Sequence, residues 1–240
     1  MKTKKIMSVL PVLKERLQNQ KNIVIITAFS LIACVLYTGV LYTPFNDYLF
    51  SSVFKTFVFI LAPMIYFAIS KNEKFTDMFP KGDKKYIKLS LLLGIAVIAI
   101  IAGIFIIIRP FIEKEMIVNT MLDYNVTDSN FPFFFIHIVL INAGLEEIFF
   151  RGFVFLTIYK TNRVYAHLYS SILFSLYHVS YLNNALNFGV FLFSVIALVI
   201  AGIIFNLLVV KCKNLSGALI VHMSANLALN LIMAYYVYLE

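Results

Sequence analysis

Apolar stretches of about 20 residues recur along the whole chain, and this pattern restricts the fold more than any other feature of the sequence. A helix of about 20 residues crosses the roughly 30 Å hydrocarbon core of a bilayer. Of the 240 residues, 61% are hydrophobic and only 13% are charged, whereas soluble domains carry about 25% charged residues. The sequence therefore predicts a polytopic membrane protein, surrounded by lipid, without a separate soluble domain.

Seven spans are predicted, and each must be helical because backbone groups in lipid have to pair within their own segment. The predicted spans are 22–43, 48–70, 87–108, 131–159, 164–181, 187–210 and 215–239. The expected fold class is an all-α integral membrane bundle of about seven transmembrane helices. The fourth span is longer than a crossing requires, so we expect it to tilt, to project into the cytoplasm or to break near Gly144.

Lysine and arginine gather in alternate connections, and this distribution predicts the orientation of the protein in the membrane. The basic segments are the arm 1–21, the connection 71–88 and the turns 160–163 and 211–213. The other connections hold two basic residues, Arg109 and Lys114, beside the acids Glu113, Glu115, Asp123 and Asp128. We therefore expect a cytoplasmic N-terminus and an external C-terminus.

The formal net charge of +8 is explained by these cytoplasmic connections, so it indicates no nucleic-acid partner. We divide the chain into the basic cytoplasmic arm 1–21, a three-span region 22–130 without a recognised motif, and the region 131–240 that carries polar motifs. The lysine-rich, tryptophan-free composition is typical of a low-GC Gram-positive bacterium, whose plasma membrane is the expected location.

Three fragments in the C-terminal half place polar groups inside apolar spans. They read Glu146-Glu147-Ile148-Phe149-Phe150-Arg151, Phe174-Ser175-Leu176-Tyr177-His178 and His222-Met223-Ser224-Ala225-Asn226. An ionisable residue at bilayer depth costs at least about 2.5–3.5 kcal/mol, so such residues usually mark a functional site. At a rise of 1.5 Å per residue, Glu146, His178 and Asn226 lie about 20 Å from the cytoplasmic ends of their spans. We expect the three fragments to meet in one pocket.

The residue types in these fragments are those of a hydrolytic site. Glu147 and Arg151 are spaced i,i+4 and share a helix face, whereas Glu146 is rotated by about 100° from Glu147. A carboxylate beside a histidine can deprotonate a water, and a histidine with an asparagine can donate hydrogen bonds to an oxyanion. Two histidines and a carboxylate can equally form a catalytic Zn²⁺ site. The residues by themselves leave both mechanisms open.

The order Glu-Glu-x-x-x-Arg, Phe-x-x-x-His and His-x-x-x-Asn resembles the CPBP family of intramembrane endopeptidases. This family includes the type II CAAX prenyl endopeptidases and the bacteriocin-processing "Abi" proteins. The resemblance covers about residues 131–235, and Gly152 also fits it. It implies that Glu146 and His178 activate the water, that His222 and Asn226 stabilise the oxyanion, and that Glu147, Arg151 and Phe174 support the site.

The resemblance does not decide whether a metal is used, because family members have been described both as metalloproteases and as metal-independent glutamate proteases. We favour the metal-free glutamate mechanism, since Asn226 is a poor zinc ligand but a good oxyanion donor. The alternative is Zn²⁺ held by Glu146, His178 and His222. The expected substrate is a peptide bond in a membrane-associated peptide or protein, either a CAAX substrate or a bacteriocin-like, signalling or leader peptide. We expect the site to open toward the cytoplasm.

Two other functions fit a polar cluster inside a membrane. One is a non-catalytic immunity or scaffold protein that binds a bacteriocin-like peptide or an envelope partner. The other is a proton-coupled transporter, although transporters usually contain internal repeats and this chain shows none.

Five polar residues inside or near the spans fall outside the motifs. We expect Lys55 to snorkel toward the outer headgroups, and we expect His137 and His167 to be non-catalytic. Asn206 and Asn230 either pack helices or line a cavity.

Overall fold

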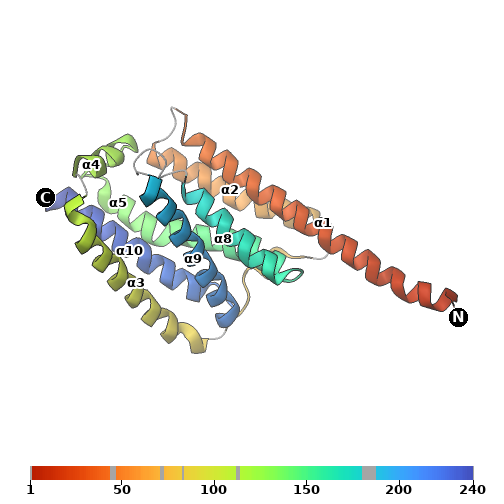
Figure 1. Cartoon of the computed structure of the whole chain (residues 1–240). Helices are drawn as coiled ribbons and strands as arrows, with labels where there is room; N and C mark the ends of the chain where they lie inside the picture. The colour runs from red at the N-terminus through yellow and green to blue at the C-terminus, as the bar shows by residue number, and fades with distance from the viewer. Residues whose placement is uncertain are drawn as a thin grey trace.

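The described residues fold into a bundle of long helices that run side by side (Figure 1). The computed structural model describes residues 2–43, 47–70, 73–82, 84–111, 114–179 and 188–239, and every element in these ranges is helical. The N-terminus and the C-terminus lie at opposite ends, and the first turns of α1 extend beyond the bundle (Figure 1). The predicted all-α fold class is confirmed.

Six helices in the described residues are long and apolar enough to cross a membrane. The spans are Leu17–Val40 within α1 (Lys2–Val40), Tyr48–Ile69 (α2), Ile87–Ile107 within α3 (Ile87–Ile108), Phe131–Tyr159, Phe191–Cys212 within α9 (Phe188–Cys212) and Ser216–Tyr238 (α10). The remaining predicted span corresponds to α8 (Arg163–Val179), which has 17 residues. Its predicted end at 181 and the predicted start of the next span at 187 lie outside the described residues. The protein is a multi-pass membrane protein, and the prediction of about seven spans is close to the observed arrangement.

The other elements are short and lie in the connections. They are η1 (Phe75–Met78), η2 (Lys84–Tyr86), η3 (Arg109–Phe111) and α4 (Lys114–Asp123).

The fourth span is one continuous helix, and two of its segments are π-helical. It consists of α5 (Phe131–Ile136), the π-helix η4 (His137–Asn142), α6 (Ala143–Glu146), the π-helix η5 (Glu147–Phe155) and α7 (Leu156–Tyr159). Gly144 lies inside this run and does not break it. An i→i+5 hydrogen bond puts more residues into each turn than an α-helix has. Wider turns therefore take up some of the residues by which the fourth span exceeds the length of a simple crossing. π-helical segments occur frequently at functional sites.

Aromatic side chains bury the fourth span in the centre of the bundle. Phe149, Phe150 and Phe153 are fully buried, and the rings of Phe149 and Phe59 stack at a centroid distance of 3.9 Å. Large buried rings contribute most of the core's packing energy. By contrast, α3 packs against α10, and only 11% of its most apolar window is buried in the protein. Polar groups on the inner face of the fourth span are therefore shielded from lipid.

Close contact between α8 and α9 positions α8, the helix that carries His178. A Cβ atom on Gly202 would lie 2.9 Å from Cα of Ser171, so the two helices approach more closely than a side chain permits. The fully buried Asn206 donates to Oγ of Ser171 at 3.2 Å and accepts from Oγ of Ser170 at 3.4 Å. Asn206 therefore packs helices, which resolves one alternative that the sequence left open.

The basic connections share one end of the bundle. Nζ of Lys160 lies 2.8 Å from Oδ2 of Asp77, and this hydrogen bond holds the pKa of the Asp77 carboxyl below its ordinary value. Gly82 adopts a φ of +75°, and its Cα lies against the side chain of Asn214 in the turn before α10. At the opposite end, Oη of Tyr238 donates to the carbonyl oxygen of Asp128 at 2.9 Å.

Candidate active site

Glu146 and Glu147 lie at the junction between α6 and η5, inside the bundle. Each residue is 1% exposed, and acids are almost never this buried unless they are paired. Successive residues of a helix point in different directions, and each of the two carboxylates accordingly has its own set of partners. Those partners determine what each acid can do chemically.

One carboxylate oxygen of Glu146, Oε1, accepts hydrogen bonds from three side chains. Nζ of Lys55 in α2 lies 2.5 Å away, Nδ2 of Asn142 donates from 3.0 Å, and Oη of Tyr177 in α8 donates from 3.2 Å. Lys55 also donates to Oδ1 of Asn142. Three donors from three helical segments fix the orientation of the carboxylate.

The other carboxylate oxygen, Oε2, faces two histidines. Nε2 of His178 lies 3.4 Å from it, and Nε2 of His222 lies 3.5 Å from it. This oxygen is buried and accepts no hydrogen bond from the described residues. The fold thus brings Glu146, His178 and His222 together from the fourth span, α8 and α10.

The hydrogen-bond partners assign the tautomers of both histidines. Nδ1 of His178 lies 2.8 Å from the carbonyl oxygen of Phe174, and Nδ1 of His222 lies 2.8 Å from Oε1 of Glu147. Both partners can only accept, so each Nδ1 carries a proton, and Nε2 presents a lone pair whenever the ring is neutral. Three electron-pair donors therefore lie together: Oε2 of Glu146 and Nε2 of each histidine. A water molecule can satisfy such a group by donating its hydrogens, and a cation can do so by coordination.

The donor types of Glu146, His178 and His222 are those of a catalytic zinc site. Within the part of the chain that the structure describes, however, no group of three or more His, Cys, Asp or Glu side chains is arranged to hold a metal ion. The Lys55 ammonium on the same carboxylate also places a positive charge there, which repels a second cation.

Glu147 connects Arg151 to His222. Nη1 of Arg151 lies 3.2 Å from Oε1 of Glu147, the same oxygen that contacts Nδ1 of His222. The ion contact lacks hydrogen-bond geometry, and none of the guanidinium nitrogens has a hydrogen-bond partner among the described residues. The guanidinium instead lies over the rings of Phe174, at 4.2 Å, and Phe205, at 4.8 Å. Charge and cation–π contacts together hold this buried group.

Asn226 lies one helical turn after His222, but its amide is engaged elsewhere. Nδ2 donates to the carbonyl oxygen of Ile138, in the π-helix η4, at 3.0 Å. The main-chain carbonyl oxygen of Asn226 accepts from Nδ2 of Asn230 at 2.8 Å. Asn230 therefore hydrogen-bonds within α10, beside Asn226.

Lys55 occupies a different place from the predicted one, and the expectation that it snorkels to the outer headgroups is wrong. The residue is 3% exposed, because its ammonium points inward to Glu146 and Asn142. Burial with a carboxylate replaces hydration of the charge. The sequence did contain a signal for this contact: a lone lysine inside an apolar span commonly pairs with an intramembrane acid.

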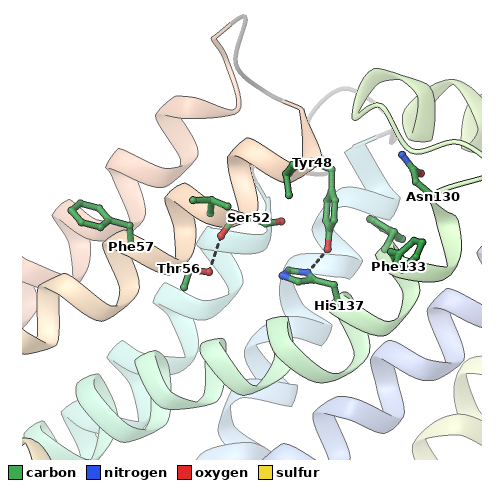
Figure 2. Close-up of a pocket in the computed structure, with 10 residues that line it drawn as sticks. Tyr48, Ser52, Thr56, Phe57, Asn130, Phe133 and His137 are labelled. Atoms are coloured by element: carbon green, nitrogen blue, oxygen red, sulfur yellow. Dashed lines mark hydrogen bonds between the residues drawn. The ribbon is translucent and has the colours of Figure 1, made fainter.

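The two remaining histidines lie outside the Glu146 cluster. His167 packs against the rings of Phe155 and Tyr159, at 4.9 and 5.8 Å. His137 accepts or donates a hydrogen bond at Nδ1 with Oη of Tyr48, at the wall of a largely apolar groove between α2 and the start of the fourth span (Figure 2).

The groove has a volume of about 740 Å³ and does not include the motif residues. Its lining residues are Tyr48, Leu49, Ser52, Val53, Thr56, Phe57, Asn130, Phe133, Phe134 and His137. Thr56 donates to the carbonyl oxygen of Ser52 at 2.8 Å (Figure 2), which satisfies its hydroxyl within α2. Because these two residues flank Lys55 in sequence, the groove lies on the helix that supplies this lysine.

Comparison with known families assigns the motif-bearing region. Residues 128–228 match the family model for type II CAAX prenyl endopeptidases of the Rce1-like type. Over these residues the chain is similar to the CPBP/CAAX protease family. The match contains all three motifs, from Glu146 to Asn226, so the resemblance noted in the sequence is confirmed. Neither the curated proteins nor the solved structures include a significant match to the chain.

The CPBP match supports a CAAX-type protease, which is a hydrolase of peptide bonds, as the class of activity. The matched segment begins before the fourth span and ends within α10, so α1, α2 and α3 lie outside it. Lys55 therefore contacts Glu146, inside the matched segment, from a region that the family match does not cover.

Proposed function

We propose that this protein is an intramembrane endopeptidase in which Glu146 and His178 activate a water molecule for attack on a peptide bond. The observation that carries the proposal is the 3.4 Å approach of Glu146 Oε2 to His178 Nε2 inside a membrane-spanning bundle. A water that donates hydrogen bonds to both acceptors from one side is oriented and can lose a proton to either one. The family match to CAAX prenyl endopeptidases supports the same reaction class.

The proposed reaction accounts for each proton. The water oxygen bonds to the carbonyl carbon while its proton moves to Oε2 of Glu146 or Nε2 of His178. The resulting oxyanion accepts a hydrogen bond from Asn226, whose Nδ2 exchanges the carbonyl of Ile138 for the oxyanion, and from Nε2 of His222 when that ring is protonated. Collapse of the tetrahedral intermediate breaks the C–N bond, and the stored proton passes to the leaving amine. The products are a new carboxyl terminus and a new amino terminus.

The exposed edge of the site suggests where a substrate approaches. The side chain of His178 is 24% exposed, whereas that of Glu146 is 2% exposed.

We place the basic connections in the cytoplasm, because positively charged loops are retained there and these connections share one end of the bundle. The N-terminus is then cytoplasmic and the C-terminus external. The substrate class is a membrane-associated peptide or protein, of CAAX, bacteriocin-like, signalling or leader type.

Comparative peptidomics tests this function directly. Membranes that contain the wild-type protein should accumulate fragments that are missing from membranes with Glu146→Gln. In parallel, the purified protein is assayed with an internally quenched peptide that ends in a farnesylated CAAX sequence, and with the same peptide lacking the farnesyl group. Identical peptidomes and no cleavage of either probe would contradict the protease hypothesis and favour a non-catalytic immunity or scaffold protein. Proton-coupled solute flux that is lost in the same variant would instead indicate a transporter.

Metal removal is expected to leave cleavage intact. The Lys55 ammonium on Glu146 and the poor ligand Asn226 both disfavour a bound dication at this site. Extended dialysis against a chelator should not change the rate on the farnesylated probe, and elemental analysis should find far less than one zinc per chain. Stoichiometric zinc whose removal stops cleavage, and whose return restores it, would assign ligand roles to Glu146, His178 and His222.

A further inference from the structure

Lys55 places its ammonium group inside the bundle, almost completely shielded from solvent. It lies in the span Tyr48–Ile69, which has a mean hydropathy of 1.9, and its side chain is 3% exposed. Moving a lone ammonium into such a site is costly. A lysine with this burial must therefore be stabilised by specific contacts.

Those contacts form an aromatic and anionic cage around the ammonium. Nζ lies 5.0, 5.6 and 5.7 Å from the ring centroids of Tyr177, Phe59 and Tyr37, within cation–π range. Oε1 of Glu146 supplies the negative charge. The rings come from α8, α2 and α1, so the first two spans form much of the cage.

The charges of the site balance in pairs when Lys55 is counted. Glu147 is paired with Arg151 and Glu146 with Lys55, and all four side chains are at most 3% exposed. Pairing offsets part of the cost of burying each charge. No lone charge is therefore left among these four side chains.

We propose that Lys55 is a positioning residue for Glu146, which binds the carboxylate through Oε1 and thereby directs Oε2 to the two histidines. The inference rests on the proposed function, and it gives the first spans a role in that reaction. Without Lys55, Oε1 retains two neutral donors, Asn142 and Tyr177. The carboxylate can then rotate, and neutral hydrogen bonds are weaker than charge-assisted ones.

The first experiment separates positioning from binding. Lys55→Met keeps the length and apolar stem of the side chain but removes the charge, and Lys55→Gln keeps a donor without the charge. On the farnesylated probe, Lys55→Met should lower kcat about 100-fold, within the range of a general base that is misplaced, and should leave KM unchanged. Lys55→Gln should lose less kcat than Lys55→Met. The control is Lys81→Met, an exposed lysine in the connection after α2, which should behave as wild type.

The second experiment uses no substrate, so it stays informative if the probe is not cleaved. Thermal stability in detergent is measured for Lys55→Met, Glu146→Gln and the double variant. Each single variant leaves one buried charge unpaired, so the double variant should be more stable than the sum of the two losses predicts.

The outcomes distinguish this inference from the proposed function. Wild-type kcat in Lys55→Met, or strictly additive stability losses, overturns the positioning role while the protease assignment stands. A wild-type protein that cleaves neither the probe nor an endogenous peptide overturns the protease assignment. In that case a coupled stability cycle still demonstrates the ion pair, but the positioning role falls with the reaction. If Lys55→Met does not fold, the kinetic test rests on Lys55→Gln.

Discussion

Glu146→Gln and His178→Ala should each lower kcat on the farnesylated probe by about 10⁴-fold, the upper range for loss of a general base. Glu146→Gln removes the carboxylate base and His178→Ala removes the imidazole, and these are the two groups, 3.4 Å apart, that are proposed to take the proton of the attacking water. The double variant should be no slower than either single one, because groups that act as one unit are non-additive. Turnover of the probe by the purified variants, measured as initial rates, checks this expectation.

The same variants should differ in stability. Glu146→Gln leaves the Lys55 ammonium without its carboxylate, so its melting temperature should fall. His178→Ala should melt near the wild-type temperature, because its side chain is partly exposed. His167→Ala provides a matched control on the same helix, since His167 lies away from the cluster, and its kcat should equal that of wild type. Near-normal turnover by purified Glu146→Gln or His178→Ala would remove that residue from the water-activating pair.

Neutralising one member of the Glu147–Arg151 pair should cost about 3–5 kcal/mol of stability, the usual cost of stranding a buried charge. Arg151→Gln leaves the Glu147 carboxylate uncompensated in a site where both side chains are at most 1% exposed. Glu147→Gln does the same to a guanidinium that has no hydrogen bond among the described residues. The double variant should recover much of the loss, because no lone charge remains. Activity should stay low, since Glu147 also orients His222 through Nδ1.

A surface pair supplies the matched control for this cycle. Lys160 and Asp77 form an ion pair at 2.8 Å whose side chains are 45% and 38% exposed. Exposed pairs typically couple by about 0–1 kcal/mol, so Lys160→Gln, Asp77→Asn and their combination should change the melting temperature only slightly. If the losses at Glu147 and Arg151 are additive, their coupling energy is no larger than that of this surface pair. That result would show that the buried side chains do not interact and would end their supporting role.

Local pattern was sufficient to predict the spans and the motif-bearing helices. Lipid satisfies no backbone hydrogen bond, so an apolar run of about 20 residues forms a transmembrane helix. The predicted span 48–70 matches Tyr48–Ile69. The i,i+4 spacing of Glu147 and Arg151 also determined their contact, because helix geometry brings such side chains together. The π-helical turns around Glu146 have no such local signature in the sequence, so the fourth span was predicted only as one overlong helix.

The sequence by itself determined that this protein is a helical membrane bundle and that its polar groups lie on the fourth span, α8 and α10. Only the tertiary structure decided that Lys55, 91 residues before Glu146, pairs with it, and that Asn226 donates to Ile138. Hydropathy fixes how each segment crosses the membrane, but it contains no information about which face meets which neighbour. That choice depends on the packing of rings such as Phe59 against Phe149, which turns α2 so that Lys55 points inward.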